Sequence, residues 1–210
     1  MPGYDVQVLS EDGKEVGPGI LGAISIKLPL PPGSLPTLWN ADDRYIESYL
    51  STFPGYYETG DAGYQDEDGY LYIMSRTDDV INVAGHRLST GAMEEAVSNH
   101  IDVAECAVIG VLDNLKGQVP LGLVCLNNGC NKPDEVICKE IIDLVRTEIG
   151  PVAAFKSVAV VSALPKTRSG KILRATIRKI ADNVDWEMPA TVDNPLVFDE
   201  IKKAIKPLGY

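Results

Sequence analysis

A chain of 210 residues, 45% of them hydrophobic and 23% charged, is long enough to bury a sizeable core as one domain or as two small ones. It contains no apolar run of about 18 residues and no basic or apolar start like a signal peptide, so we expect no membrane partner. The formal net charge of −11 argues against sequence-independent binding of nucleic acid.

The cysteines indicate a reducing compartment. Cys106, Cys125, Cys130 and Cys138 form no Cys-x-x-Cys pair, and the chain has two histidines, so a zinc site is not expected. Cys106 and Cys125 lie in apolar, strand-like runs, which predicts buried thiols. The expected location is therefore the cytoplasm or the mitochondrial matrix.

The first part of the chain reads as a small β-rich unit. Alternating apolar and polar residues predict strands over 4–9, 22–28, 56–65 and 69–76. A proline-rich loop is expected over 28–39 and a short helix over 42–50. We expect this unit to cover residues 1–77.

The pattern changes after Arg76 to apolar runs alternating with helical periodicity. Strands are expected over 103–111, 119–126 and 157–161. Helices are expected over 90–100, 134–150 and 170–181, with one more within 194–210. Two or three strands with helices packed on them predict a compact α+β domain over residues 78–210.

One basic segment stands out in this acidic protein. Residues 166–179 hold six Lys or Arg and no acidic residue. We place Lys171 in the first turn of a helix from about Gly170, on a flexible loop, where the helix dipole disfavours a cation unless an anion binds there. A solvated basic face is the alternative. A phosphate-binding P-loop is excluded, because Pro165 stands where that motif needs glycine.

A second set of polar residues lies beside β segments and turns. Asp61 can accept hydrogen bonds from two ribose hydroxyls, and the guanidinium groups of Arg76 and Arg87 suit phosphate oxygens. Taken alone, each of them fits an ordinary surface charge better than a binding residue. Spacing alone does not identify a nucleotide site.

Three segments together resemble a known family. "YYETGD", "GYLYIMSRTDDVINVAGHRL" and "LPKTRSGKILR" look like C-terminal core motifs of the adenylate-forming acyl-CoA synthetases, and "IGPVAAF" is typical of their short-chain branch, the acetyl- and propionyl-CoA synthetases. The resemblance runs from Tyr4 to about Asp182. The upstream phosphate loop, the aromatic-x-Thr-Glu motif and the acyl pocket of the family are missing, so the chain resembles the last third of such an enzyme.

The resemblance implies a two-step ligase reaction. Family members use ATP with Mg²⁺ to convert a carboxylate to an acyl-adenylate, and they then transfer the acyl group to CoA, with no bound organic cofactor. It also implies that residues 1–77 end the large adenylating domain and that residues 78–210 form a lid that rotates. The lid would turn about a hinge at Asp78.

The resemblance also assigns roles in nucleotide chemistry. Asp61 matches the residue that binds the ATP ribose, Arg76 a second nucleotide contact, and Arg87 a contact to the ATP phosphates. Lys171 matches the lysine that bridges the carboxylate and the α-phosphate. It is also a type of site for inhibitory acylation, which implies a lysine acylase and deacylase as partners.

For CoA, Gly85 matches a glycine beside the pantetheine tunnel and Arg146 an arginine that binds a CoA phosphate. Ala84 stands where acetate-type members often have serine, and Ala92 replaces a usual glutamate, which puts fine CoA contacts in doubt. His100 falls where some members bind magnesium. The expected further ligands there are the carbonyls of Ser98 and Val103; the alternative is a packed histidine at a helix end.

Several readings stay open at this stage. A fragment of a synthetase for acetate or propionate, missing its N-terminal domain, is expected to be inactive by itself. A free-standing lid-like module that binds nucleotide or CoA is one alternative. An adenylating enzyme that loads a carrier protein is another.

Overall fold

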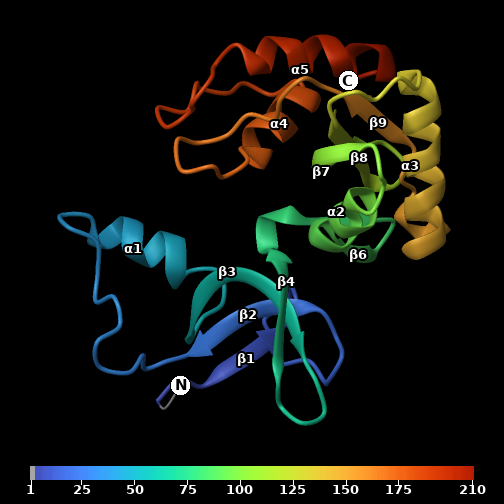
Figure 1. Cartoon of the computed structure of the whole chain (residues 1–210). Helices are drawn as coiled ribbons and strands as arrows, with labels where there is room; N and C mark the ends of the chain where they lie inside the picture. Colours follow the sequence, from blue (N-terminus) through green and yellow to red (C-terminus); the bar gives the residue numbers. More distant parts are fainter. Residues whose placement is uncertain (1–2) are drawn as a thin grey trace. The chain divides into compact units, whose positions relative to one another are not determined.

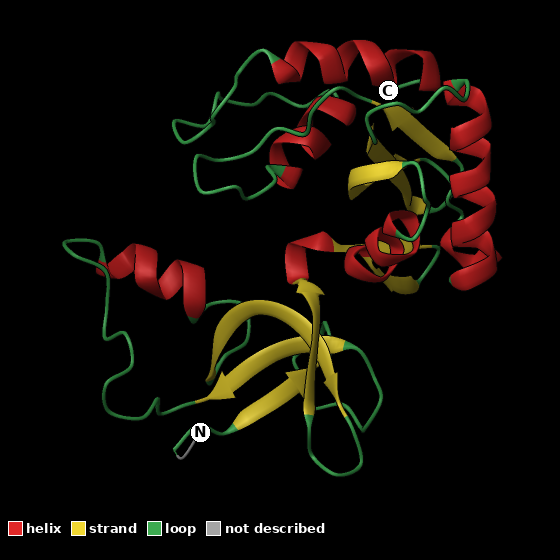
Figure 2. Cartoon of the chain, in the orientation of Figure 1, coloured by secondary structure: helices red, strands yellow, loops and turns green. Residues whose placement is uncertain are grey.

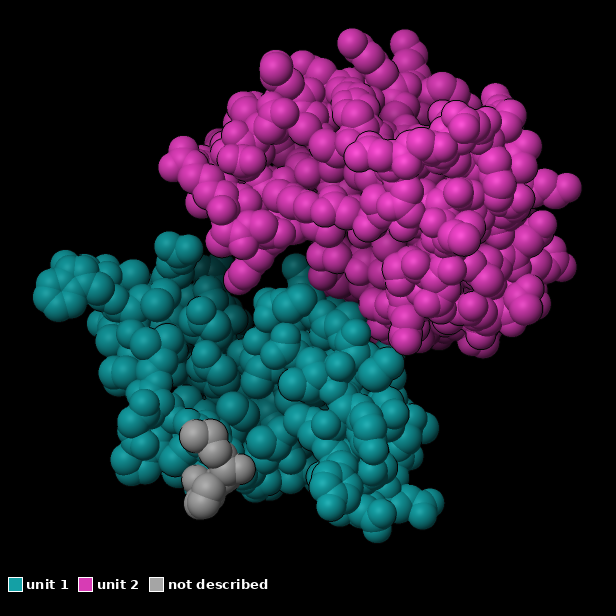
Figure 3. Space-filling model, viewed as in Figure 1, with its two compact units in different colours: residues 1–78 teal, residues 79–210 magenta. Residues whose placement is uncertain are grey.

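The computed structural model describes residues 3–210, which fold into two compact units (Figure 3). The first unit ends at Asp78, and the second runs from Asp79 to Tyr210. The short 3₁₀ helix η1, Thr77–Asp79, carries the chain from one unit to the next. No helix in residues 3–210 has the length and apolar composition needed to span a membrane.

Unit 1 is an antiparallel sheet of four strands in the order β1-β2-β3-β4 (Figures 1 and 2). Its elements are β1 (Val6–Leu9), β2 (Gly22–Lys27), α1 (Asp42–Tyr49), β3 (Tyr56–Gln65) and β4 (Leu71–Arg76). All five lie where the sequence predicts them. The core is small: Leu9, Ala23 and Phe53 form its buried cluster, with Tyr56 packed partly against it.

Unit 2 contains a five-stranded sheet. Its strands are β5 (Val80–Val83), β6 (His86–Ser89), β7 (Val103–Asp113), β8 (Gly117–Leu126) and β9 (Ser157–Val160). The order is β6-β5-β8-β7, and β9 pairs with β8 in parallel. The sequence predicts β7, β8 and β9 but misses the β5–β6 hairpin, because two strands of four residues are too short for a clear alternation.

Helices cover both faces of this sheet. They are α2 (Thr90–Ser98), α3 (Asp134–Glu148), α4 (Arg174–Ala181) and α5 (Val197–Ile205). Alternate residues of β8 point to opposite faces of the sheet, so they contribute to two different cores. Val124 packs in the cluster with α2 and α3, whereas Leu121 and Leu123 pack in the cluster with α4 and α5. The expected α+β domain, a short sheet flanked by helices, is confirmed.

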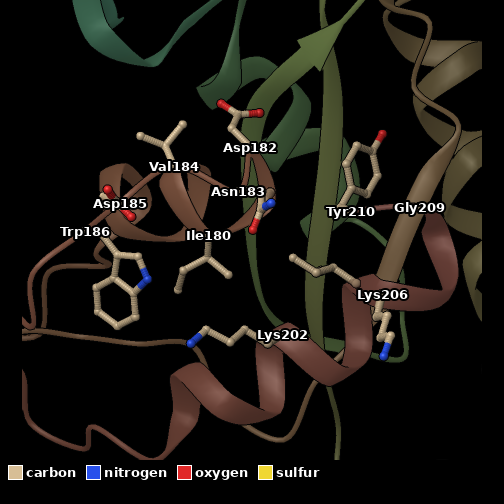
Figure 4. Close-up of a pocket in the computed structure, with 12 residues that line it drawn as sticks. Ile180, Asp182, Asn183, Val184, Asp185, Trp186, Lys202, Lys206, Gly209 and Tyr210 are labelled. Atoms are coloured by element: carbon tan, nitrogen blue, oxygen red, sulfur yellow. The ribbon is translucent and has the colours of Figure 1, made fainter.

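The segment after α4 folds back onto α5. The ring of Trp186 lies 5.0 Å from that of Phe198, and the Lys202 ammonium lies 5.3 Å from the Trp186 ring centre. Trp186, Lys202 and Tyr210 line a hollow of about 660 Å³ (Figure 4). None of the site residues predicted from the sequence lines this hollow.

Candidate functional site

Lys171 lies on a tight hairpin rather than in a helix. The Thr167 N–H donates to the Lys171 carbonyl at 2.8 Å, and the Lys171 N–H donates to Thr167 Oγ1 at 3.1 Å. Gly170 has φ +86°, which favours glycine. Helix α4 begins at Arg174, so the prediction of a helix from Gly170 is wrong, and the helix dipole does not act on Lys171.

Backbone hydrogen bonds also tie this hairpin at its base and to the segment after α4. The Leu173 N–H donates to the Pro165 carbonyl at 2.9 Å, which closes its base, and the Arg168 N–H donates to the Thr191 carbonyl at 3.0 Å. The Lys171 side chain is exposed, and its ammonium has no hydrogen-bond or ion-pair partner within residues 3–210. The loop therefore presents a free cation on a backbone of defined shape.

The "TGD" motif forms a bulge on β3. The register with β2 shifts between Ile24 and Ser25, so that Thr59 and Gly60 have no partner residues on β2. Thr59 Oγ1 donates to the Ile24 carbonyl at 2.6 Å and accepts the Asp61 N–H at 3.2 Å. The threonine thus fixes the bulge that positions Asp61.

Arg76 lies across this bulge. It is the β4 partner of Asp61, and its Nη1 lies 3.3 Å from Asp61 Oδ1 and 3.3 Å from the Thr59 carbonyl oxygen. A Cβ on Gly60 would lie 2.5 Å from Arg76 Nη2, so glycine makes room for the guanidinium. Asp78 Oδ1 lies 3.5 Å from Arg76 Nε. The predicted nucleotide and hinge residues of unit 1 therefore form one cluster.

The predicted CoA residues Ala84 and Gly85 form the two-residue turn of the β5–β6 hairpin. Their φ angles are +50° and +89°, as a hairpin turn of the I′ type requires. Nothing lies within 4 Å of a Cβ added to Gly85, so the backbone conformation, not crowding by the described residues, is what favours glycine. Arg87 lies half-buried on β6, opposite Asn82 of β5.

A basic hollow adjoins that turn. The Ala84 N–H donates to the Lys116 carbonyl at 2.8 Å, and Lys116 lines a hollow of about 300 Å³ together with Arg146 and Lys156. Asp113 caps the β7–β8 turn by accepting the Lys116 and Leu115 N–H groups at 2.8 and 2.9 Å, and these bonds lower the pKa of Asp113. Three cations from separate elements suit a phosphate-bearing ligand.

His100 belongs to a charged cluster. Its Nδ1 accepts the Asp102 N–H at 3.2 Å, and its Nε2 lies 3.0 Å from Glu140 Oε2. Lys132 Nζ lies 2.9 Å from a carboxylate oxygen of Asp102 and from one of Glu140. The ligand atoms of His100, Asp102 and Glu140 lie within 4.8 Å of one another. Both ring nitrogens are engaged and a lysine supplies the positive charge, so the cluster does not fit a magnesium ion.

The four cysteines are free thiols. Cys125 is buried as predicted, whereas Cys106, on the outer strand β7, is only half-buried and donates to the Glu94 carbonyl at 3.4 Å. Desolvation, followed by the charge of Glu94, raises the pKa of Cys106 to about 11. It is therefore a protonated, poorly reactive thiol at neutral pH.

The structure thus divides the predicted residues among several places. Asp61, Arg76 and Asp78 meet in unit 1, and Arg146 lines the basic hollow of unit 2, to which the Ala84–Gly85 turn is joined through Lys116. Arg87 on β6, His100 in its charged cluster and Lys171 on its hairpin stand apart from these groups. Sequence reasoning missed Lys116 and Lys156, because single lysines in turns carry no recognisable pattern. Only the fold places them beside Arg146.

The chain is similar in sequence to known proteins. Residues 92–171 match the AMP-binding enzyme C-terminal domain. The chain is 58% identical over 206 residues to an uncharacterized protein of Pseudomonas aeruginosa, covering 98% of this chain and 33% of that protein. It is 48% identical to acyl-CoA synthetase short-chain family member 3, mitochondrial, of Mus musculus, covering 98% of this chain and 30% of that protein.

A solved structure extends the similarity to the fold. Acetoacetyl-CoA synthetase from Streptomyces lividans superposes with a TM-score of 0.79 at 23% identity, covering 98% of this chain and 31% of that one. The chain spans about a third of the length of the curated relatives it matches. The chain therefore carries the AMP-binding enzyme C-terminal domain and is homologous to the C-terminal third of short-chain acyl-CoA synthetases.

Proposed function

We propose that the chain is the C-terminal part of an AMP-forming ligase that joins a short-chain carboxylate, acetate or propionate, to CoA. In the first step a carboxylate oxygen attacks the α-phosphorus of ATP, and the bond to the pyrophosphate oxygen breaks. In the second step the CoA sulfur attacks the acyl carbon, AMP leaves, and the thiol proton is released. The exposed, unpaired Lys171 on its ordered hairpin is the observation that carries this proposal.

In the first step Lys171 would stabilise the charge shared by the carboxylate and the α-phosphate. An unpaired ammonium on a fixed loop suits this role, because it loses no protein partner when the anions bind. Acylation of its nitrogen would remove the charge and stop adenylation. The exposure of Lys171 makes it accessible to a lysine acylase or deacylase.

Asp61 would hold the ribose of ATP, and Arg76 and Arg87 would contact the nucleotide. The bulge that fixes Asp61 through Thr59 supports this role, since a carboxylate that pairs with two hydroxyls needs a defined direction. ATP would arrive with Mg²⁺ as part of the substrate. Asp78 would act as the hinge about which the lid turns between the two steps.

CoA would use the basic hollow of unit 2. Arg146, Lys116 and Lys156 would face a phosphate group, and the Ala84–Gly85 turn beside them would lie along the pantetheine arm. The three cations supply the charge that a CoA phosphate requires. The mitochondrial relative and the four free cysteines support a reducing compartment, the cytoplasm or the mitochondrial matrix.

The test uses the complete enzyme, with this chain joined to its upstream part. Acetate- or propionate-dependent exchange of pyrophosphate into ATP reports the first step. Lys171→Ala is expected to lower this exchange by a factor of about 10² to 10³, because it removes the charge that stabilises the transition state. Exchange at the normal rate in this variant would refute the role of Lys171.

The 210-residue chain alone is expected to form no acyl-adenylate, since the phosphate loop and the acyl pocket lie upstream in the family. Release of pyrophosphate from acetate or propionate by the isolated chain would contradict this. Loading assays with CoA and with a carrier protein distinguish the synthetase from a carrier-loading enzyme. A native polypeptide of the size of this chain on a blot would favour a free-standing binding module.

A further inference from the structure

Glu94 on α2 holds the guanidinium of Arg174 with both carboxylate oxygens. Oε1 accepts a hydrogen bond from Arg174 Nε at 2.9 Å, and Oε2 accepts one from Nη2, also at 2.9 Å. The side chains of Glu94 and Arg174 are 18% and 25% exposed. A two-pronged ion pair that is largely shielded from water fixes both distance and orientation.

The same carboxylate is fixed to the sheet. Oε1 also accepts the Val108 N–H at 2.9 Å, and Val108 lies on β7, at the end of the strand order β6-β5-β8-β7. Glu94 thus satisfies an N–H group on the outer edge of β7. Its position is set by the helix that carries it and by the strand beside it, so Arg174 is tied to both α2 and β7.

Arg174 is the first residue of α4 and follows Lys171 by three positions. Between them, the Leu173 N–H closes the base of the hairpin on the Pro165 carbonyl. Only Ile172 and Leu173 separate Lys171 from Arg174, and Ile172 pairs with Lys166 across the hairpin. A displacement of the Arg174 backbone would therefore move the leg of the hairpin that carries Lys171.

The other leg of the hairpin has a side-chain ion pair beside its backbone hydrogen bonds to residues 191–193. Lys166 Nζ lies 2.5 Å from Glu105 Oε1, but these side chains are 33% and 47% exposed. A single-pronged pair in solvent contributes little, because water screens it and both side chains lose rotamer freedom. The Glu94–Arg174 pair is accordingly the better shielded of the two side-chain anchors.

We propose that Glu94 is a positioning residue for adenylation: through Arg174 it sets the place of the Lys171 ammonium. This inference rests on the proposed role of Lys171. In this role Glu94 contacts no substrate and acts only through the hairpin that carries Lys171. Since a misplacement of about 1 Å can cost a factor of 10² in rate, loss of this anchor should slow the step that uses Lys171.

The experiment separates the two half-reactions in the complete enzyme. Pyrophosphate exchange reports adenylation, and thioester formation from a supplied acyl-adenylate and CoA reports the second step. Glu94→Gln keeps the size of the side chain and loses its charge. It is expected to lower the turnover number of adenylation by a factor of about 10 to 10² and to change thioester formation by less than about twofold.

Glu95→Gln is the matched control, because Glu95 is the next residue on α2 and is exposed. It should leave both half-reactions unchanged. Arg174→Lys keeps the charge but loses the two-pronged geometry, and it carries the test if Glu94→Gln does not fold. It should reproduce the selective loss of adenylation.

Normal adenylation in both Glu94→Gln and Arg174→Lys would overturn the proposal. An equal loss of both half-reactions would also overturn it, since that result indicates a purely structural role. Lys171→Ala distinguishes the proposed role of Lys171 in adenylation from the proposed positioning role of Glu94. If Lys171→Ala keeps adenylation, the proposed function of Lys171 fails; if it loses adenylation while Glu94→Gln does not, only the positioning role fails.

Discussion

The two units of this protein differ in how much of their apolar surface they bury. In unit 2 both faces of the sheet are covered by helices, and each face has its own buried cluster. In unit 1 the buried cluster consists of three residues, whereas the edge strand β4 exposes Leu71, Tyr72, Ile73 and Met74. Unit 2 therefore covers its own apolar surfaces, whereas unit 1 has an apolar strand that its own residues leave uncovered.

The strongest test of this contrast is to produce the units separately. Residues 79–210 alone are expected to unfold in one cooperative transition, because both of their cores are internal. Residues 1–78 alone are expected to show no cooperative transition, because so small a core cannot offset the conformational entropy of the chain. Circular dichroism during urea titration measures both, and a sharp transition for residues 1–78 would remove the contrast.

One point substitution in each unit tests the same difference in burial between the two units. Phe198→Ala in α5 is expected to lower the free energy of unfolding by about 3–5 kcal/mol, because it leaves a cavity in a filled core. Phe198 is 1% exposed, whereas Ile73 on β4 is 65% exposed. Ile73→Ala should change the free energy of unfolding by less than about 0.5 kcal/mol in the same urea titration. Similar losses for both would show that β4 is covered in solution.

A third test concerns the bulge that carries Asp61. Gly60 and Gly55 have φ angles of +76° and +89°, so an alanine at either is strained by about 1 kcal/mol. At Gly60 the new Cβ also meets the Arg76 guanidinium, whereas at Gly55 it meets nothing within 4 Å. Gly60→Ala should therefore destabilise unit 1 more than Gly55→Ala in urea unfolding. Equal effects would mean that the guanidinium moves aside freely.

The smallest expected effect is a pH dependence in unit 2. Hydrogen bonds from Lys132 are the main reason that the pKa values of Asp102 and Glu140 lie below their ordinary range. A lowered carboxyl pKa stabilises the fold above the unfolded value of about 4, and this contribution is lost as the pH falls through the folded pKa.

Lys132→Gln should therefore flatten the loss of stability between about pH 5 and pH 3. Thermal unfolding of residues 79–210 at several pH values measures the slope. Lys139→Gln is the control, because Lys139 is the neighbour of Glu140 in α3 and has no ion pair within the described residues. An unchanged slope in Lys132→Gln would assign the acid sensitivity of this unit to other carboxyl groups.

Much of the fold could be predicted from local pattern. The strands of unit 1 alternate cleanly, and α3 shows a full apolar stripe with Ile137, Ile141 and Val145 buried. The short strands β5 and β6 could not be found in this way. They form by pairing with each other and with β8, and four residues are too few to show an alternating pattern. The predicted start of α4 was wrong for a related reason. Residues 170–173 continue the helical periodicity of the sequence, but backbone hydrogen bonds to residues 165–167 hold them in a hairpin.

The family resemblance, the α+β class and the candidate residues could all be predicted from the sequence, because they depend on motifs and on local periodicity. Which residues lie next to one another became visible in the folded structure alone. It placed Lys116 and Lys156 beside Arg146, gave both nitrogens of His100 protein partners, and joined Glu94 to Arg174 across 80 positions of the chain. Such pairings depend on how elements distant in sequence pack. The periodicity of one segment shows which of its faces is apolar, but not which segment packs against that face.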